Sequence, residues 1–242
     1  MRYFNENKLE DIINEIQQQY LSDNRPWIIG YSGGKDSSTV AQLIFRALKE
    51  LKQKDEDLNK PVYIISADTL VETPMIIDFI SETLKNINKK AKELDLPIKA
   101  QLVQPDFEES FWTLLIGKGY PSPRQMFRWC TDRLKIKPTT NFIKKQLNEY
   151  DEVIVVLGVR KGESASRDKV LENAKFEGKK LKRHNSLNNA YIYAPIENFD
   201  TEDVWHYLLI KNEGISPWDT DNNNLYSLYR ESDSECPMVI NK

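Results

Sequence analysis

The feature that most constrains the fold is an apolar run that ends in a pair of glycines and leads directly into a helical pattern. The run is Trp27-Ile28-Ile29-Gly30-Tyr31, the turn is Ser32-Gly33-Gly34-Lys35-Asp36-Ser37, and apolar residues then recur with helical spacing from Val40 to Leu51. A helix that begins at such a turn presents unpaired backbone amides to any group bound there. The order strand, glycine turn, helix therefore predicts an α/β unit with a binding site at its turn.

Further apolar runs repeat this unit along the chain. We predict strands over Val62–Ala67, Ile98–Val103 and Val153–Gly158. A helix should follow the first of them near Thr73-Pro74, where threonine suits the cap and proline the first turn. Continuous apolar strands that alternate with helices indicate a parallel sheet covered on both sides. We therefore expect an α/β fold, a doubly wound and mostly parallel sheet with helices on both faces, in one domain over residues 1–242.

Outside these units, the chain has three local signals. Apolar residues at helical spacing predict a helical N-terminus over about residues 1–24, and an Asn-rich, charged stretch predicts a polar insertion loop over about residues 169–190. The acidic run Asp200-Thr201-Glu202-Asp203 precedes an apolar pattern and predicts a capped helix. Three tryptophans are expected in the core, with base stacking as the alternative: Trp112, Trp129 and Trp205.

Charge is distributed unevenly along the chain, although the net charge is only −3. Residues 117–145 hold eight Lys/Arg and one Asp, a local +7, and residues 158–183 a local +5, whereas residues 197–235 total −8. Basic stretches suit polyanionic ligands, and the alternative is a solvated surface. The chain has no apolar run long enough for a membrane span and no signal-peptide pattern at Met1–Glu6, so we expect a cytoplasmic protein.

The glycine turn has the chemistry of a phosphate site. Glycines allow the backbone to approach an anion, the helix start faces it, Lys35 adds a positive charge, and Ser32 and Ser37 add hydroxyl donors. The spacing is not that of a Walker A loop, because Gly30 and Gly34 enclose three residues and Asp follows the lysine. Transfer of the γ-phosphate is therefore disfavoured. The alternative is an ordinary glycine-rich turn.

The turn is similar to the PP-loop of the N-type ATP pyrophosphatases, and other motifs resemble their PAPS reductase-like branch. These motifs are Asp68–Thr73, Arg133–Pro138, Gly158–Arg167 and Pro195–Phe199 with Asp203-Val204-Trp205. Within that branch, Ser110–Trp112, Ile116–Pro121 and Phe127–Thr131 resemble DndC, the ATP pyrophosphatase component of bacterial DNA phosphorothioation. The resemblance implies an adenine nucleotide alpha hydrolase-like fold, with ATP and Mg²⁺ bound at the turn.

The resemblance also implies roles for single residues. Lys35 and the amides of Gly33 and Gly34 would hold the pyrophosphate that leaves ATP, with Asp36 binding Mg²⁺ or orienting the loop. Asp68 would contact the nucleotide or its metal, and its alternative role is that of an acid at a helix start. Six basic residues would contact phosphates, with plain surface charge as the alternative: Arg160 and Arg167 for ATP, and Arg128, Arg133, Lys135 and Lys137 for DNA or another anion.

The implied reaction adenylylates a DNA backbone phosphate before sulfur is inserted, with a cysteine desulfurase and other phosphorothioation subunits as partners. One rival is a sulfonucleotide reductase, whose attacking C-terminal cysteine has no counterpart after Cys236. The other rival is a DNA-binding subunit that retains an inactive loop. Cys130 and Cys236 match two of the thiolates that hold a [4Fe-4S] cluster in DndC-like proteins, a ligand set that is incomplete here because a cubane needs four. A shared site would place their sulfurs within about 7 Å, and the alternative is two buried thiols.

Overall fold

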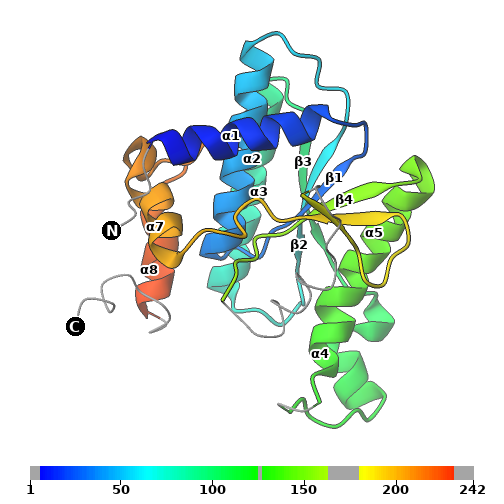
Figure 1. Ribbon diagram of the computed structural model, residues 1–242. Helices are drawn as coiled ribbons and strands as arrows, with labels where there is room; N and C mark the ends of the chain where they lie inside the picture. Colours follow the sequence, from blue (N-terminus) through cyan, green and yellow to red (C-terminus); the bar gives the residue numbers. More distant parts are fainter. Residues whose placement is uncertain (1–5, 125–126, 163–179, 232–242) are drawn as a thin grey trace.

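The computed structural model of the protein describes residues 6–124, 127–162 and 180–231, and its centre is a six-stranded sheet (Figure 1). The strands lie in the order β3-β2-β1-β4-β6-β5. Their bounds are β1 Trp27–Gly30, β2 Val62–Ala67, β3 Ile98–Val103, β4 Val153–Val156, β5 Leu181–Arg183 and β6 Ala190–Tyr193. All neighbouring strands run parallel except β5, which pairs antiparallel with β6. The predicted doubly wound, mostly parallel sheet is therefore confirmed.

The strand order reverses between β1 and β4. From β1 the chain moves outward to β2 and β3, then returns to the other side of β1 as β4. In an open parallel sheet, the carboxyl ends of the two strands at such a reversal form a crevice in which ligands bind. The glycine turn, which begins at Ser32, follows β1, and Gly158 lies just beyond β4. Both therefore flank this crevice.

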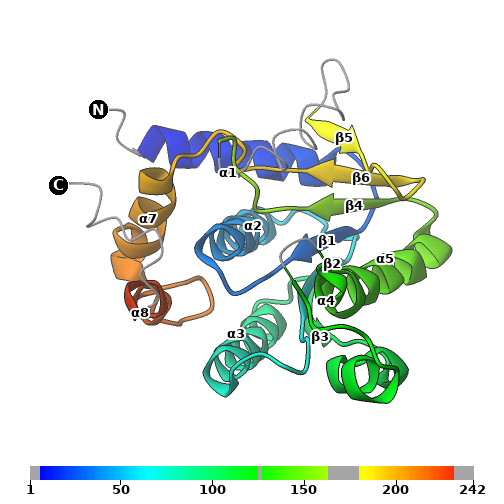
Figure 2. The same cartoon turned by 90° about the horizontal axis from the view of Figure 1, so that it is seen from below.

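Helices cover both faces of the sheet (Figure 2). One face packs against α1, α2, α3 and α7, whose apolar residues join Trp27 and Ile29 in the larger core. The other face packs against α5, where Ile143 meets Ile28 and Val155 in a smaller core. The helices are α1 Glu6–Leu21, α2 Lys35–Gln53, α3 Pro74–Glu93, α5 Lys137–Tyr150, α7 Thr201–Leu209 and α8 Asn223–Glu231. No helix in the described ranges combines the length and the apolar character needed to cross a membrane.

The predicted elements are present, but several of their boundaries differ. The strand predicted over Val153–Gly158 ends at Val156, and the N-terminal helix predicted over about residues 1–24 is α1, Glu6–Leu21. The helix expected at Thr73-Pro74 begins there, although the Thr73 side chain makes no capping hydrogen bond. The cap at Asp200 is a capping box with Asp203. Of the loop predicted over residues 169–190, residues 184–189 are in no helix or strand, and residues 169–179 lie outside the described residues. The prediction was wrong for Leu181–Arg183, which form β5. This short strand buries Leu181 and extends the sheet by pairing with β6. The polar composition of the segment gives no indication of this pairing.

A segment of short helical turns projects from the sheet at the lower end of Figure 1. We call residues 107–136 the projecting segment; it contains turns at Phe107–Glu109 and Thr113–Gly117, then α4 (Trp129–Thr131) and a turn at Asp132–Ile136 that continues into α5. Trp129 is buried here and stacks on Phe111, as expected, and Trp205 is also buried. The expectation of a buried Trp112 was wrong: it is 59% exposed and meets the Phe111 ring edge-on.

Candidate active site

The glycine turn lies at the strand reversal and needs its glycines for two different reasons. Gly33 has a φ of 74°, a conformation that side chains rarely adopt, and a Cβ there would come 2.9 Å from Cγ1 of Ile80. Gly34 precedes α2 as its N-cap, and a Cβ there would come 2.9 Å from the hydroxyl oxygen of Tyr229. The turn is therefore held tightly between α3 and α8.

Two serine hydroxyls close the turn on itself. The Ser37 hydroxyl donates to the carbonyl oxygen of Gly34 at 3.0 Å and accepts from the amide of Ser32 at 3.2 Å. The Ser32 and Ser37 hydroxyl oxygens lie 3.1 Å apart. Ser37 is buried and Ser32 exposed, so Ser37 shapes the turn while Ser32 faces the cavities beside it.

The start of α2 carries the site's principal cation. Gly34 has no side chain to cap the helix, so the first-turn amides must find other partners. One of them, the Lys35 amide, donates to the Tyr229 hydroxyl at 3.1 Å. The Lys35 side chain is only 5% exposed; its Nζ lies 3.5 Å from Oδ2 of Asp36 and 5.2 Å from the centre of the Tyr229 ring. A mostly buried ammonium and a helix start thus face the same point.

Asp36 connects the turn to the loop after β4. Its Oδ1 accepts from Nε of Arg160 at 2.6 Å, and Arg160 also donates to Oγ1 of Thr201 at 3.1 Å. Arg160 is 5% exposed, so this is a buried ion pair that joins β4, α2 and the start of α7. Of the two roles that the resemblance implies for Asp36, these contacts favour orienting the loop.

The contact between β4 and α2 depends on Gly158. A Cβ at this position would lie 2.9 Å from three backbone atoms, namely the carbonyl carbon and oxygen of Asp36 and the amide nitrogen of Ser37. Backbone atoms cannot rotate away as a side chain can. Glycine at 158 therefore allows the end of β4 to approach the helix start that forms the site.

Asp68 lies at the carboxyl end of β2, as predicted. One carboxylate oxygen accepts from the amide of Leu70 at 2.9 Å, and the other from Nε2 of Gln104 at 2.8 Å. Leu70 has a φ of 62°, so the aspartate stabilises an unusual backbone turn. Because Asp68 lies before this turn and five residues before the Thr73 cap, its alternative role as a helix-start acid does not apply.

Two cavities adjoin the glycine turn. One, of about 360 Å³, lies at the ends of β1 and β2 and is lined by apolar side chains such as Ile76 and Ile80 together with the polar Ser66, Glu72, Lys135 and Thr139. The other, of about 550 Å³, lies between α3 and α8 and is lined mostly by apolar side chains. Both reach Ser32, so a ligand in either cavity can extend to the turn.

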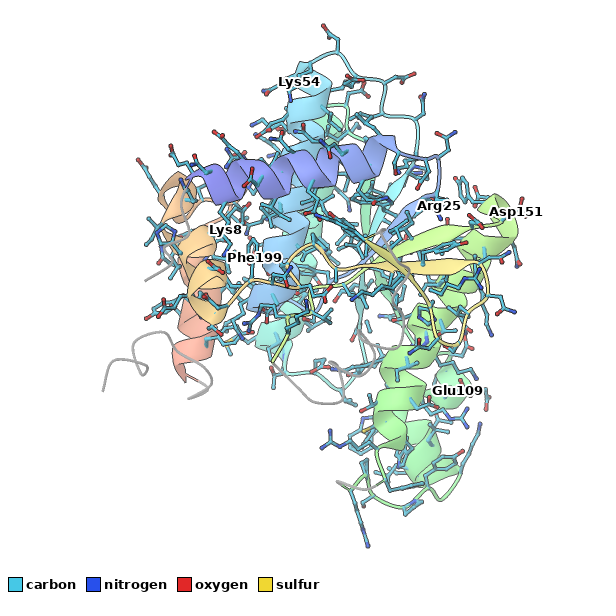
Figure 3. All side chains as sticks on the ribbon, viewed as in Figure 1. Lys8, Arg25, Lys54, Glu109, Asp151 and Phe199 are labelled. Carbon is cyan, nitrogen blue, oxygen red and sulfur yellow. The ribbon has the colours of Figure 1, made fainter. Side chains whose placement is uncertain are left out.

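The predicted anion-binding residues of the projecting segment and of the start of α5 are mostly paired with carboxylates. Nζ of Lys135 lies 3.0 Å from Oε1 of Glu72 and faces the smaller cavity. Arg133 and Lys137 both donate to Glu109, at 3.1 and 2.6 Å, and the hydrogen bond from Lys137 lowers the pKa of that carboxyl. Figure 3 labels Glu109 in the projecting segment and Lys54, just past α2, at the opposite end of the molecule. Arg128 is exposed.

The residues expected to bind metals differ in where they lie and in what they contact. Asp36 and Asp68 are engaged by protein donors, and the described ranges contain no group of three or more His, Cys, Asp or Glu side chains suited to a metal. This donor set suits a Mg²⁺ ion that binds mainly through substrate phosphates. Cys130 is half-buried with a free thiol. Cys236 and Arg167 lie outside the described residues, so the expected sulfur proximity remains a prediction, and Cys130 alone does not fit a cluster.

Several residues that shape the site were not found from sequence. Tyr229 touches the turn from α8, nearly two hundred positions along the chain, and no local pattern marks it. Gln104 and Thr201 likewise hold Asp68 and Arg160 through contacts between separate elements. Glu109 meets Arg133 and Lys137 only in the folded structure, because they lie 24 and 28 positions further along the chain. These contacts arise from the strand order, which a motif search does not provide.

Known proteins resemble this chain over most of its length. Two uncharacterised proteins of Methanocaldococcus jannaschii are 27% and 26% identical to it, over 84% and 98% of this chain. The chain spans only 35% and 47% of their respective lengths. Among solved structures, a PAPS reductase from Candida auris in complex with phosphate has a TM-score of 0.49 at 15% identity, covering 91% of both chains. A tRNA thiolase from Methanococcus maripaludis, with its [4Fe-4S] cluster, has a TM-score of 0.46 at 15% identity, covering 96% of this chain and 76% of that one.

The family assignment rests on a match that contains the glycine turn and most of the residues around it. Residues 26–218 match the model of the phosphoadenosine phosphosulfate reductase domain. The matched range includes the glycine turn, the strand reversal and the pair formed by Asp36 and Arg160. Since it also accounts for most of the sequence, the chain belongs to the phosphoadenosine phosphosulfate reductase domain family.

Proposed function

We propose that the chain is an ATP pyrophosphatase that adenylylates a backbone phosphate of DNA ahead of sulfur insertion. A non-bridging oxygen of the DNA phosphate bonds to the α-phosphorus of ATP. The bond from that phosphorus to the α–β bridging oxygen breaks, and pyrophosphate leaves with the electron pair. A cysteine desulfurase is the proposed sulfur source, and other phosphorothioation subunits are the proposed partners.

The observation that carries the proposal is the convergence at the start of α2. Lys35, the first-turn amides and the glycine turn face one point, with Arg160 fixed close by through Asp36. Such an arrangement stabilises negative charge that develops on a leaving group, because its dipoles and cations are already in place. It supports pyrophosphate as that leaving group. Mg²⁺ would supply further neutralisation of phosphate charge when it binds with ATP, held mainly by the phosphates themselves.

The smaller cavity supports a nucleoside beside this phosphate site. It opens at the ends of β1 and β2, contains the exposed Ser32, and is bounded by Ile76 and Ile80 as well as by polar groups. Apolar walls with a few polar groups are typical of sites that hold a flat heterocycle in a fixed orientation. Lys135, at the rim and paired with Glu72, lies where a nucleotide phosphate or an incoming acceptor can replace that carboxylate.

The projecting segment supports a nucleic acid as the acceptor. It joins α5, which contributes Thr139 to the smaller cavity, and it exposes the rings of Phe107, Trp112 and Phe127 as well as Arg128. Exposed aromatic rings among cations bind nucleic acids by base stacking together with phosphate contacts. Pairing with Glu109 reduces the charge that Arg133 and Lys137 offer to a phosphate.

The phosphate role of the turn is tested by Lys35→Ala with ATP and DNA present. We expect pyrophosphate release to fall below about 1% of wild type, since removing a preorganised charge contact costs about a hundredfold or more. Lys52→Ala is the matched control, because Lys52 lies in the last turn of the same helix, exposed and paired with Asp95. Retained activity in a folded Lys35→Ala variant would remove the proposal. Sulfite release from PAPS without DNA would instead favour the reductase.

The acceptor is tested separately by DNA binding at several salt concentrations. Arg128→Glu should weaken binding to every DNA sequence and reduce the salt dependence by about one counterion. The triple reversal of Arg128, Arg133 and Lys137 should weaken binding further. DNA affinity that neither variant changes would remove the nucleic acid from the proposal and leave the ATP site intact.

A further inference from the structure

We infer that Tyr229 is a latch on the phosphate site: its hydroxyl occupies the place of a phosphate oxygen at the start of α2, and the bound phosphate displaces it. This inference rests on the proposed function, because it requires that the glycine turn binds phosphate. It adds a residue from the C-terminal part of the chain that acts on the site by occupying it.

Two distances define the latch position. The Tyr229 hydroxyl accepts a hydrogen bond from the Lys35 amide at 3.1 Å, so it uses the donor that a helix start offers to an anion. The same oxygen would lie 2.9 Å from a Cβ on Gly34, so it also fills the space that opens where Gly34 lacks a side chain. A phosphate oxygen that bonds the Lys35 amide must occupy this same space.

The ring of Tyr229 contacts the second group of the phosphate site, which is the ammonium of Lys35. The ring centre lies 5.2 Å from Nζ of Lys35, within range of a cation–π contact. With Tyr229 in place, the amide and the ammonium of Lys35 both face the tyrosine. One side chain therefore occupies both groups that the proposed function assigns to the leaving pyrophosphate.

The surroundings of Tyr229 allow it to leave. It packs edge-on against Trp205 of α7, with ring centres 5.2 Å apart, and it also lines the cavity of about 550 Å³ between α3 and α8. A displaced ring can therefore turn into this cavity while α8 stays anchored through the buried Leu225. The latch sets a threshold: only a ligand that bonds the helix start more strongly than a neutral hydroxyl opens it.

The experiment measures pyrophosphate binding by calorimetry to three forms of the full chain: wild type, Tyr229→Phe and Tyr226→Phe. The Tyr226 ring also packs on Trp205, at 5.5 Å, so its variant removes a hydroxyl from the same helix as a matched control. We expect Tyr229→Phe to bind pyrophosphate about threefold to tenfold more tightly than wild type, the range of one net hydrogen bond. Tyr226→Phe should match wild type.

A second measurement needs no variant. Amide hydrogen exchange in α8 of the wild-type chain should speed up when pyrophosphate is added, because the latch contact is lost, while exchange at the start of α2 slows. Unchanged or weaker binding by Tyr229→Phe, or slower exchange in α8, would overturn the latch and leave the phosphate site standing. If none of the three forms binds pyrophosphate, the proposed function fails and the latch with it.

Discussion

Gly158→Ala should damage the site although Gly158 itself has no assigned contact with substrate. The added methyl would lie 2.9 Å from the backbone of Asp36 and Ser37, closer than methyl groups approach backbone atoms. Since β4 is fixed in the sheet between β1 and β6, the start of α2 has to move instead. The perturbation therefore acts on the amides that the account assigns to phosphate.

The size of the effect follows from two opposing contributions. Overpacking of this kind costs about 1–3 kcal/mol, and replacing glycine by alanine recovers about 0.4–1 kcal/mol by restricting the unfolded chain. The free energy of unfolding should fall by about 1–2 kcal/mol as the net of these. Pyrophosphate affinity should fall about tenfold, because shifts well below 1 Å at a positioned site are costly.

Urea unfolding and pyrophosphate calorimetry measure both quantities. Gly30→Ala is the matched control, because a methyl at the end of β1 would meet only Cδ2 of Leu157, at an ordinary 3.7 Å. It should unfold within about 0.5 kcal/mol of wild type and bind pyrophosphate normally. The reasoning is refuted if Gly158→Ala is as stable as Gly30→Ala and binds pyrophosphate with wild-type affinity.

Two further predictions concern ion pairs. Asp36→Asn removes the carboxylate that accepts from the buried Arg160 at 2.6 Å, so urea unfolding should show a loss of about 3–5 kcal/mol. Asp95→Asn, which breaks an exposed pair, should leave the unfolding midpoint almost unchanged. Equal midpoints for the two variants would contradict the buried-pair assignment. The hydrogen bond from Lys137 lowers the pKa of Glu109 below its ordinary 4.5, so this carboxylate stabilises the fold above pH 4.5 and its contribution disappears as pH falls through the lowered pKa. Glu109→Gln should therefore lose less stability than wild type between about pH 6 and pH 3, and a parallel loss in both proteins would count against the pairing.

Sequence reasoning predicts those parts of the fold that depend on local periodicity. The strand, glycine turn and helix at residues 27–51 and the helix start at Thr73-Pro74 follow from residue spacing alone, and the structure confirms them. β5 could not be predicted in this way. Its three residues lie in a charged stretch, and they form a strand only because the edge of β6 offers hydrogen-bond partners.

The same distinction between local sequence and contacts across the fold applies to the residues of the site. The turn residues were found because one continuous segment contains them, and Arg160 because a second motif does. The summed charge of the basic segment did not predict that Glu109 pairs with two of its cations, since pairing depends on how the projecting segment folds back on α5. Tyr229 was missed for the same reason: only the packing of α8 on α7 brings it to Lys35.

The products formed from ATP labelled at the α-phosphate test the central claim most directly. The wild-type chain, supplied with Mg²⁺ and DNA, should convert the label to AMP or to adenylylated DNA, and pyrophosphate should appear in equal amount. The same label recovered as ADP, with free phosphate in place of pyrophosphate, would show cleavage between the β and γ phosphates and would contradict the account.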